Sequence, residues 1–286
     1  MKTGLAVTSP HAHDAVATGA GAGTVTVPSG VPALEPRPGD LATRFAGRLG
    51  GTHPVPLFLA AVLLGYALLA AASIVAALLV TEVILSIDAV QRGDERFVDW
   101  IVGRRTPFVE DASLLGSIMA GGVVIPALIA AVLVACAVLR RWRIAAFVLF
   151  SVAVESATYR ATTLVVHRER PDVERLESLP VNESIPSGHT AASIALYCGI
   201  ALLLTSAVTK TSARVAIWAV ALAIPPFVAL SRMARGMHHP TDLAVGVLIG
   251  IGALAVVLFA ARAAGAAAER RASRRDDPRT VSQGNR

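Results

Sequence analysis

Long apolar runs separated by short polar segments set the pattern of this 286-residue chain. A helix needs about 20 consecutive apolar residues to cross the hydrocarbon core of a bilayer. Six runs approach or exceed that length: Val55–Leu85, Ala112–Leu139, Ile144–Val166, Gly188–Val208, Val215–Ser231 and Pro240–Ala261. The pattern therefore predicts an all-α membrane protein, a polytopic bundle of six transmembrane helices.

The composition agrees with a membrane protein. Hydrophobic residues make up 54% of the chain and charged residues only 16%, against about 25% charged residues in soluble domains. The formal net charge of +6 would indicate nucleic acid only if the basic residues formed a stripe on a soluble face. They lie instead in short clusters between apolar runs, so membrane lipids are the expected partners and nucleic acid is not.

The basic clusters also predict the orientation of the six helices. Lys and Arg precede the first span, follow the sixth, and connect the second span to the third and the fourth to the fifth. An even number of spans puts all of these clusters on one side, and the positive-inside rule makes that side the cytoplasm. Loops 86–111, 167–187 and 232–239 then face outward. These loops also carry arginines, and a bound anion would explain the arginines of the second and third loops.

The two ends of the chain differ from the six-span region, which we place at residues 55–265. Residues 1–54 are rich in Gly, Ala, Thr and Pro, which is typical of a disordered cytoplasmic tail. Residues 266–286 are basic, which is typical of a cytoplasmic tail lying against anionic lipids. In the first outer loop, an apolar face at 97–101 predicts a short interfacial helix, and an ordinary polar loop is the alternative.

Three polar segments at the outer ends of spans three to six stand out. They are His167-Arg-Glu-Arg-Pro171, Pro186-Ser-Gly-His189, and the run from Ser231 to Asp242. An apolar protein has no packing reason to keep such residues. Because all three segments lie on the same predicted face of the membrane, they are expected to converge on one functional site.

The residue types in these segments favour an anion. Ser187 is suited to N-cap the fourth span, and Gly188 lets a ligand approach the backbone. The free N–H groups and the positive dipole end of that helix form an anion site. Arg170 and Arg232 add planar guanidinium groups, which bind phosphate oxygens bidentately. No acidic cluster of the metal-binding type accompanies them, so neither a metal nor another cofactor is expected.

The third segment also contains a candidate nucleophile. Pro240 is well placed as the first residue of the sixth span, which puts Asp242 in its first turn. A carboxylate accepting the Nδ1–H of His238 would fix the tautomer and aim Nε2 outward. His239 is the alternative nucleophile, but the spacing to Arg232 and Asp242 favours His238.

These motifs resemble the type 2 phosphatidic acid phosphatase family, which shares its site with the vanadium haloperoxidases. The resemblance covers about residues 55–265, and six spans with an outward-facing site are similar to the bacterial membrane members of that family. It therefore implies a lipid phosphatase of the bacterial plasma membrane. The motifs are Arg170-Pro171, Pro186-Ser-Gly-His189, and Ser231-Arg232 with His238 and Asp242.

The resemblance implies a role for each matching residue. His238 would attack phosphorus to form a phosphohistidine, with Asp242 orienting it. His189 would protonate the departing lipid oxygen and then activate water, as a general acid–base does. The phosphate oxygens would be held by Arg170, Arg232, Ser187 and Gly188.

One position departs from the family pattern. The family has a lysine seven residues before the equivalent of Arg170, and this chain has Thr163 there. A phosphate-binding cation is therefore missing from its usual place. Arg160 or Arg168 could supply it. The departure bears on substrate preference, since the nucleophile, its orienting group and the acid are all present.

The sequence thus predicts a metal-independent lipid phosphate or diphosphate phosphatase. An isoprenoid carrier diphosphate, such as undecaprenyl diphosphate, is the first choice of substrate because an outward site suits carrier recycling. Phosphatidic acid and phosphatidylglycerophosphate are alternatives, and so is a lipid phosphotransferase. A membrane protein that only binds an anion or a lipid is the non-enzymatic alternative. The joint presence of His189, His238 and Asp242 disfavours it, because binding alone needs only arginines and helix ends.

Overall fold

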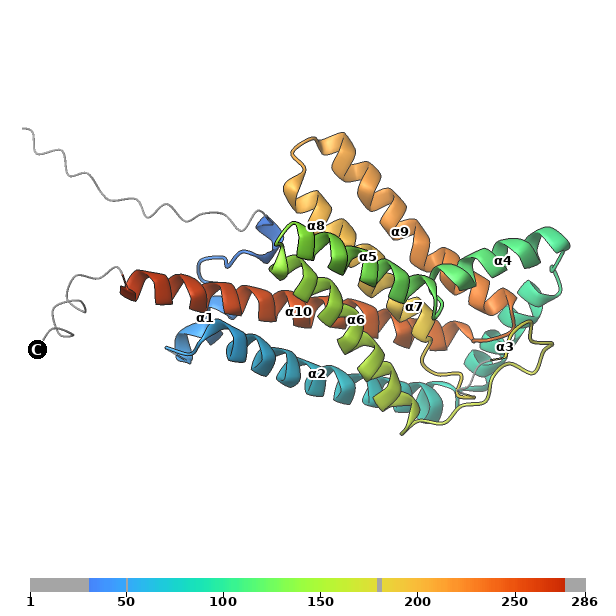
Figure 1. The fold of residues 1–286 in the computed structure, drawn as a ribbon. Helices are drawn as coiled ribbons and strands as arrows, with labels where there is room; N and C mark the ends of the chain where they lie inside the picture. Colours follow the sequence, from blue (N-terminus) through green and yellow to red (C-terminus); the bar gives the residue numbers. More distant parts are fainter. Residues whose placement is uncertain (1–30, 50, 179–181, 276–286) are drawn as a thin grey trace, which may run out of the picture.

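The computed structural model describes residues 31–49, 51–178 and 182–275, and all regular elements in these ranges are helical. The prediction of an all-α fold is confirmed (Figure 1). In chain order, the elements are η1 (Pro32–Leu34), α1 (Leu41–Arg48), α2 (Pro54–Leu78), η2 (Leu79–Ile84), α3 (Asp88–Val102), α4 (Pro107–Met119), α5 (Val124–Val138), α6 (Trp142–Thr163), α7 (Gly188–Ser193), η3 (Ile194–Cys198), α8 (Gly199–Ala207), α9 (Thr211–Ala234) and α10 (Pro240–Arg275).

The predicted membrane spans correspond to these helices. Five continuous helical stretches are long and apolar enough to cross a membrane: α2 with η2, α6, α7 with η3 and α8, α9, and α10. The remaining predicted span, Ala112–Leu139, is a bent pair, α4 and α5, with an angle of 42° between the two helices. The bend falls at the short break before Val124, where Gly121 and Gly122 leave the chain free to turn.

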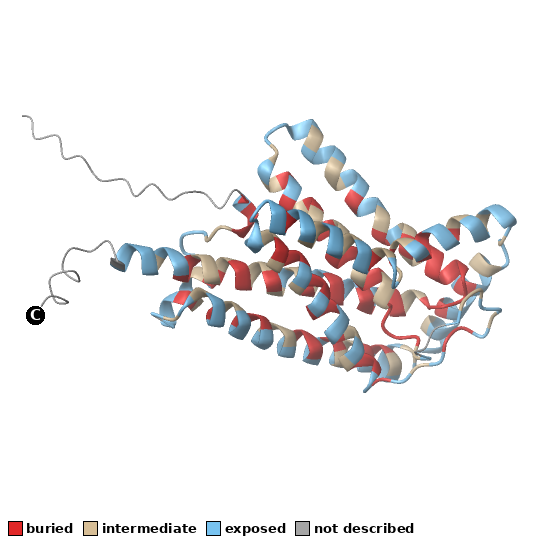
Figure 2. Cartoon of the chain, in the orientation of Figure 1, coloured by how far each residue is buried: buried red, intermediate tan, exposed pale blue. Residues whose placement is uncertain are grey.

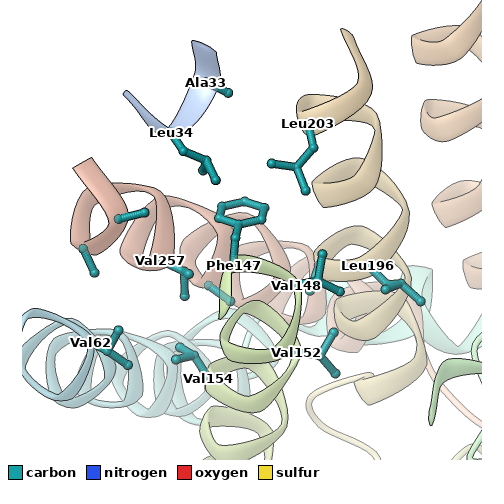
Figure 3. Packing of buried hydrophobic residues seen from close by; sticks show 14 of the residues in the cluster. Ala33, Leu34, Val62, Phe147, Val148, Val152, Val154, Leu196, Leu203 and Val257 are labelled. Carbon is teal, nitrogen blue, oxygen red and sulfur yellow. The ribbon is translucent and has the colours of Figure 1, made fainter. Parts of the chain in front are cut away.

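Helix α10 runs through the middle of the bundle, beside α2, α6, α1 and α7, while α4 packs on α9 (Figure 1). Phe147 of α6 is fully buried at the centre of the largest apolar cluster, among side chains from α2, η1, α8 and α10 (Figure 3). Figure 2 shows exposed residues along the outer sides of the helices, and many of the exposed residues are large and apolar. Such a surface suits contact with lipid rather than water.

Two glycines let α10 approach α7 closely. A Cβ atom at Gly246 would lie 2.6 Å from the carbonyl oxygen of Ser187, and one at Gly250 would lie 2.7 Å from that of Ala191. A larger residue at either position would push the two helices apart. The close contact places the start of α10 directly beside the start of α7.

The expectation of a disordered tail through residue 54 is wrong for residues 31–49. Leu34 is completely buried and belongs to the apolar cluster around Phe147. The carbonyl groups of Ala33 and Leu34 accept hydrogen bonds from Arg262 and Arg143. Apolar burial and satisfied backbone groups outweigh the entropic cost of ordering this short stretch. Residues 1–30 lie outside the described ranges.

The other end of the predicted six-span domain also extends further. Helix α10 continues past residue 265 to Arg275, and Ala266 and Ala267 pack against Ala42 and Ala46 of α1. The small alanine side chains allow this close helix contact, so α1 extends the bundle. Residues 276–286 lie outside the described ranges.

The helix predicted in the first polar loop is present as α3, so the alternative of an ordinary loop is wrong. Phe97 and Trp100 are exposed on one side of α3, with stacked rings whose centroids are 5.9 Å apart. The opposite side buries Val98 and Asp94. The helix therefore exposes aromatic rings on one side and buries a carboxylate on the other.

Candidate active site

The three polar segments singled out in the sequence meet at one end of the bundle, which we call the site end. It comprises α3, the connection from α6 to α7, the start of α7, the end of α9 and the start of α10 (Figure 1). Hydrogen bonds join the segments directly. The N–H of Ser187 donates to the carbonyl of Asp242 at 3.1 Å, and Arg170 donates to the carbonyl of Met237 at 2.5 Å.

His238 lies in the short turn between α9 and α10. Gly236 adopts φ +71°, a left-handed conformation that favours glycine, and the N–H of Met237 closes the turn on the carbonyl of Arg232 at 2.9 Å. The turn is buried rather than exposed, because residues 231–239 are all buried. His238 itself is only 3% exposed.

The hydrogen bonding of His238 fixes its tautomer. Its Nδ1 lies 2.6 Å from the carbonyl oxygen of Ser184. A carbonyl can only accept, so Nδ1 carries the hydrogen and Nε2 of the neutral ring holds a lone pair. Burial lowers the pKa of His238 well below its usual value, against the opposing charge of Asp242. The ring is therefore neutral at physiological pH, as a nucleophile requires.

Asp242 does not accept the Nδ1–H of His238, which corrects the expected geometry. Its nearest carboxylate oxygen is 3.9 Å from that nitrogen. The carboxylate instead accepts from the Ser184 hydroxyl at 2.5 Å, from the His239 N–H at 2.7 Å, and from Arg168. The backbone carbonyl of Ser184 takes the place next to Nδ1 of His238 that the sequence assigned to Asp242. Asp242 therefore acts on His238 through Ser184 and through its charge.

His239, the alternative nucleophile, is held differently. Its backbone N–H binds the Asp242 carboxylate, and its Nδ1 is buried 3.4 Å from that carboxylate without a hydrogen bond. No backbone acceptor fixes its tautomer as Ser184 fixes that of His238. The geometry favours His238, in agreement with the spacing argument.

Arg232 presents one edge of its guanidinium group without partners. The side chain is fully buried at the end of α9. Its Nη1 donates to Glu177 at 2.5 Å and to the hydroxyl of Ser117. Its Nε and Nη2 are buried and have no hydrogen-bond partner. Buried donors are normally paired, and Nε with Nη2 form the fork that binds two oxygens of one phosphate.

Glu177, in the connection between α6 and α7, holds the other edge of Arg232. Its second carboxylate oxygen accepts from Nε of Arg235, so it bridges two arginines. Burial alone would raise the pKa of Glu177, but Arg232, Ser117 and Arg235 outweigh it and hold the pKa at about 2. The ionised carboxylate fixes Arg232 in place. Sequence reasoning missed Glu177, because a lone glutamate in a charged loop carries no distinguishing pattern.

His189 occupies the first turn of the span that begins at Gly188. Its ring lies within the electrostatic reach of Arg232, Glu177 and Arg170. The charges of Arg232 and Arg170 also act on His238. The two histidines and the two arginines therefore form one cluster, as the sequence predicts.

The start of α7 is built differently from the expected N-cap. Ser187 occupies the N-cap position, but its hydroxyl pairs with that of Thr190 at 3.0 Å and does not cap the helix. The first N–H groups of this span are thus left without that cap. At Gly188 a Cβ atom would lie 3.2 Å from the ring of Tyr159, so the glycine is also needed for helix packing.

The two arginines considered as substitutes for the family lysine are not equivalent. Thr163 is buried and donates to the carbonyl of Arg160 at 3.1 Å, so it acts as part of the end of α6. The Arg160 side chain is exposed. Arg168 is bound by two carboxylates, Asp94 and Asp242. Those partners occupy its guanidinium group, which argues against a direct phosphate contact.

The chain is similar to known proteins in sequence and in fold. Residues 144–265 match the family model of the PAP2 superfamily. None of the curated proteins matches the chain. A solved PAP2-type phosphatidylglycerolphosphate phosphatase from Bacillus subtilis superposes with a TM-score of 0.56 at 23% identity, covering 71% of this chain and 93% of that one. LpxE from Aquifex aeolicus gives a TM-score of 0.45 at 24% identity, covering 57% and 93%.

The matched residues run from the third residue of α6, through α7, α8 and α9, into α10 as far as residue 265. They carry His189, His238 and Asp242, and also Arg170 and Arg232. The part of the chain that carries the site is therefore similar in sequence to the PAP2 superfamily, and it lies in a polytopic helical bundle.

Proposed function

We propose that this protein hydrolyses a lipid phosphate or diphosphate without a metal, through a phosphohistidine formed on His238. The buried, unpartnered Nε and Nη2 of Arg232 are the observation that carries the proposal. A protein that used Arg232 only for structure would pair these donors, because leaving each one unsatisfied costs about 1–3 kcal/mol. Two oxygens of a phosphoryl group would satisfy both at once.

The first step transfers the phosphoryl group to the enzyme. Arg232 and Arg170 hold the phosphate oxygens, assisted by Ser187 and the backbone of Gly188, and stabilise the charge that develops in transfer. The Nε2 lone pair of His238 forms the bond to phosphorus while the bond from phosphorus to the leaving oxygen breaks, which is the lipid hydroxyl oxygen of a monophosphate or the bridging oxygen of a diphosphate. His189 gives its proton to that oxygen, and the lipid product leaves.

The second step returns the enzyme to its starting state. Phosphorylated at Nε2 and protonated at Nδ1, the His238 ring is cationic, and the Ser184 carbonyl and the Asp242 charge stabilise it. His189, now neutral, takes a proton from water, and the water oxygen attacks phosphorus. The P–N bond breaks and inorganic phosphate is released. The second step regenerates protonated His189 and neutral His238.

For the substrate we propose an isoprenoid carrier diphosphate such as undecaprenyl diphosphate. The reason is topological, since the basic clusters predict cytoplasmic termini and an extracytoplasmic site in a bacterial plasma membrane. Phosphatidic acid and phosphatidylglycerophosphate are the alternatives. Thr163 supplies no cation where the family has a lysine, so further headgroup contacts would come from Arg160 or from the arginines of the connection between α6 and α7.

The test is phosphate release from a panel of these three lipids, by purified protein in detergent with EDTA present. His238→Ala is compared with His239→Ala, a control at a neighbouring histidine that is also buried. The proposal expects release by the wild type, its loss in His238→Ala, and inhibition by vanadate. An active His238→Ala protein would refute the assigned nucleophile, and loss of activity in EDTA would refute the metal-independent mechanism.

The same preparation separates the remaining alternatives. A lipid phosphotransferase would pass the trapped phosphoryl group to a lipid or sugar hydroxyl faster than to water. A protein that only binds lipid would retain the labelled lipid and release no phosphate from any member of the panel. The orientation is tested separately, by reaction of single cysteines in the site-end loops with an impermeant reagent in intact cells.

A further inference from the structure

A buried carboxylate on α3 lies next to the start of α10. Asp94 is 5% exposed, and α3 lies outside the residues that match the family model. One oxygen accepts from the N–H of Thr241 at 3.0 Å, and the other accepts from the Thr241 hydroxyl at 2.7 Å. The second oxygen also accepts from Nη2 of Arg168 at 2.6 Å. Asp94 therefore makes three hydrogen bonds to two segments of the site end.

Arg168 connects Asp94 to the proposed catalytic carboxylate. Its Nη1 donates to Asp242 and, at 2.7 Å, to the hydroxyl of Thr241. The guanidinium side chain is 12% exposed, and the side chains of Asp94 and Asp242 are 2% and 0% exposed. Two buried carboxylates thus share one arginine. Such a cluster is costly to desolvate, so it calls for a reason other than stability.

The chain of contacts continues to the nucleophile. Asp242 accepts from the Ser184 hydroxyl, and the Ser184 carbonyl accepts from Nδ1 of His238. Asp242 also accepts the N–H of His239, the residue that follows His238. Every contact from Asp94 to His238 is therefore a hydrogen bond between described atoms.

We propose that Asp94 is a positioning residue for the reaction, which acts on His238 through Arg168 and Asp242. The inference rests on the proposed function. With Asp94 absent, the single charge of Arg168 would balance Asp242 alone. With Asp94 present, the three groups carry one net negative charge beside His238. That charge stabilises the imidazolium ring of the phosphohistidine, which forms only after substrate has bound.

This charge argument predicts a particular kinetic effect. The phosphate contacts belong to Arg170 and Arg232, and Asp94 touches neither of them directly. Loss of the Asp94 charge should therefore lower kcat and leave KM nearly unchanged. Outer partners of functional histidines in metal sites typically contribute about 10- to 100-fold, and a fall in kcat of that size is expected here.

The experiment compares Asp94→Asn with Asp99→Asn, using phosphate release as the assay. Asparagine keeps the shape of the side chain and an oxygen for the Thr241 N–H. Asp99 lies on the same helix with an exposed side chain, so Asp99→Asn controls for a general effect of charge on α3. The expected result is a lower kcat for Asp94→Asn alone, with similar KM and similar thermal unfolding in all three proteins.

A double-mutant cycle that combines Asp94→Asn with Arg168→Gln tests whether Asp94 acts on His238 through Arg168. If Asp94 acts through Arg168, the double variant should be no slower than Arg168→Gln alone, whereas independent effects would multiply. Asp94→Ser carries the test if Asp94→Asn does not fold: a lower kcat at similar KM supports the inference, and wild-type kinetics overturns it.

The outcomes separate this inference from the proposed function. A wild type that releases no phosphate from any lipid of the panel contradicts the proposed function. An active wild type with an Asp94→Asn variant of equal kcat contradicts only the role of Asp94. An increase in KM at constant kcat would also overturn it, because it would place Asp94 in substrate binding.

Discussion

Replacement of Arg232 by lysine tests the site most directly. The guanidinium group uses one edge for Glu177 and Ser117 and leaves the other edge, Nε and Nη2, unpartnered. A lysine has one ammonium group at the end of a flexible stem. It can pair with Glu177 or with phosphate, but it cannot present a fork to two phosphate oxygens while Glu177 holds it in place.

The size of the effect follows from the two unpartnered donors. A hydrogen bond to a charged group is worth about 1.5–3 kcal/mol, so losing two of them in the transition state costs about 3–6 kcal/mol. At 1.36 kcal/mol per tenfold change in rate, kcat/KM should fall by about 10²- to 10⁴-fold. The same loss should weaken inhibition by vanadate, because the inhibitor uses the same fork.

The control is Arg235→Lys, measured by phosphate release under identical conditions. Arg235 shares Glu177 with Arg232 and is also buried, but its three nitrogen atoms all have acceptors, among them Ser113 and the carbonyl of Leu176. Its replacement should reduce thermal stability and change kcat/KM far less. The reasoning is refuted if folded Arg232→Lys keeps kcat/KM within about tenfold of wild type, a difference of only 1.4 kcal/mol.

Three further predictions follow from the site. The pKa of Glu177 falls from 4.5 to about 2 on folding. Its stabilising contribution should therefore be complete above pH 4.5 and disappear as pH falls towards 2, so Glu177→Gln should melt below wild type at pH 7, and this difference should shrink in acid. The pKa of His238 is lowered by burial, so the acid limb of kcat/KM that reports this nucleophile should lie well below pH 6.5; a limb at or above 6.5 would contradict the buried, neutral ring. Gly246→Ala should reduce both activity and thermal stability, because its Cβ would lie 2.6 Å from the Ser187 carbonyl; a fully active, stable variant would show that α7 and α10 need not approach so closely.

The sequence predicts the bundle and the meeting of the three segments because both depend on short stretches of neighbouring residues. Apolar length identifies each span, and the motifs around His189 and His238 fall at helix ends that face the same side. The hydrogen-bond partners of those motifs come from residues far away in the sequence. Ser184 binds His238 through its backbone carbonyl, and no side-chain pattern reports which carbonyl a fold will present.

Asp94 shows the same limit on α3. Four charged residues lie close together at positions 92, 94, 95 and 96, and their spacing does not reveal which one turns inward. Only the contact with Thr241 and Arg168 selects Asp94. The prediction for the N-terminal stretch is wrong for a related reason, since Val31, Ala33 and Leu34 form a short apolar run among prolines whose burial depends on contacts with distant helices.

The site also assigns the two acidic groups different tasks. Glu177 is tied to Arg232, the proposed phosphate-binding arginine, whereas Asp242 is tied to Ser184 in the segment that holds His238. Neither carboxylate contacts a ring nitrogen of His238 at hydrogen-bond distance, and the tautomer is set by a neutral carbonyl. A carbonyl orients the ring without raising its pKa as strongly as a directly bonded carboxylate would. In the proposed mechanism, His238 therefore stays unprotonated in the resting protein, and the carboxylate charge would take full effect only when phosphorylation makes the ring cationic.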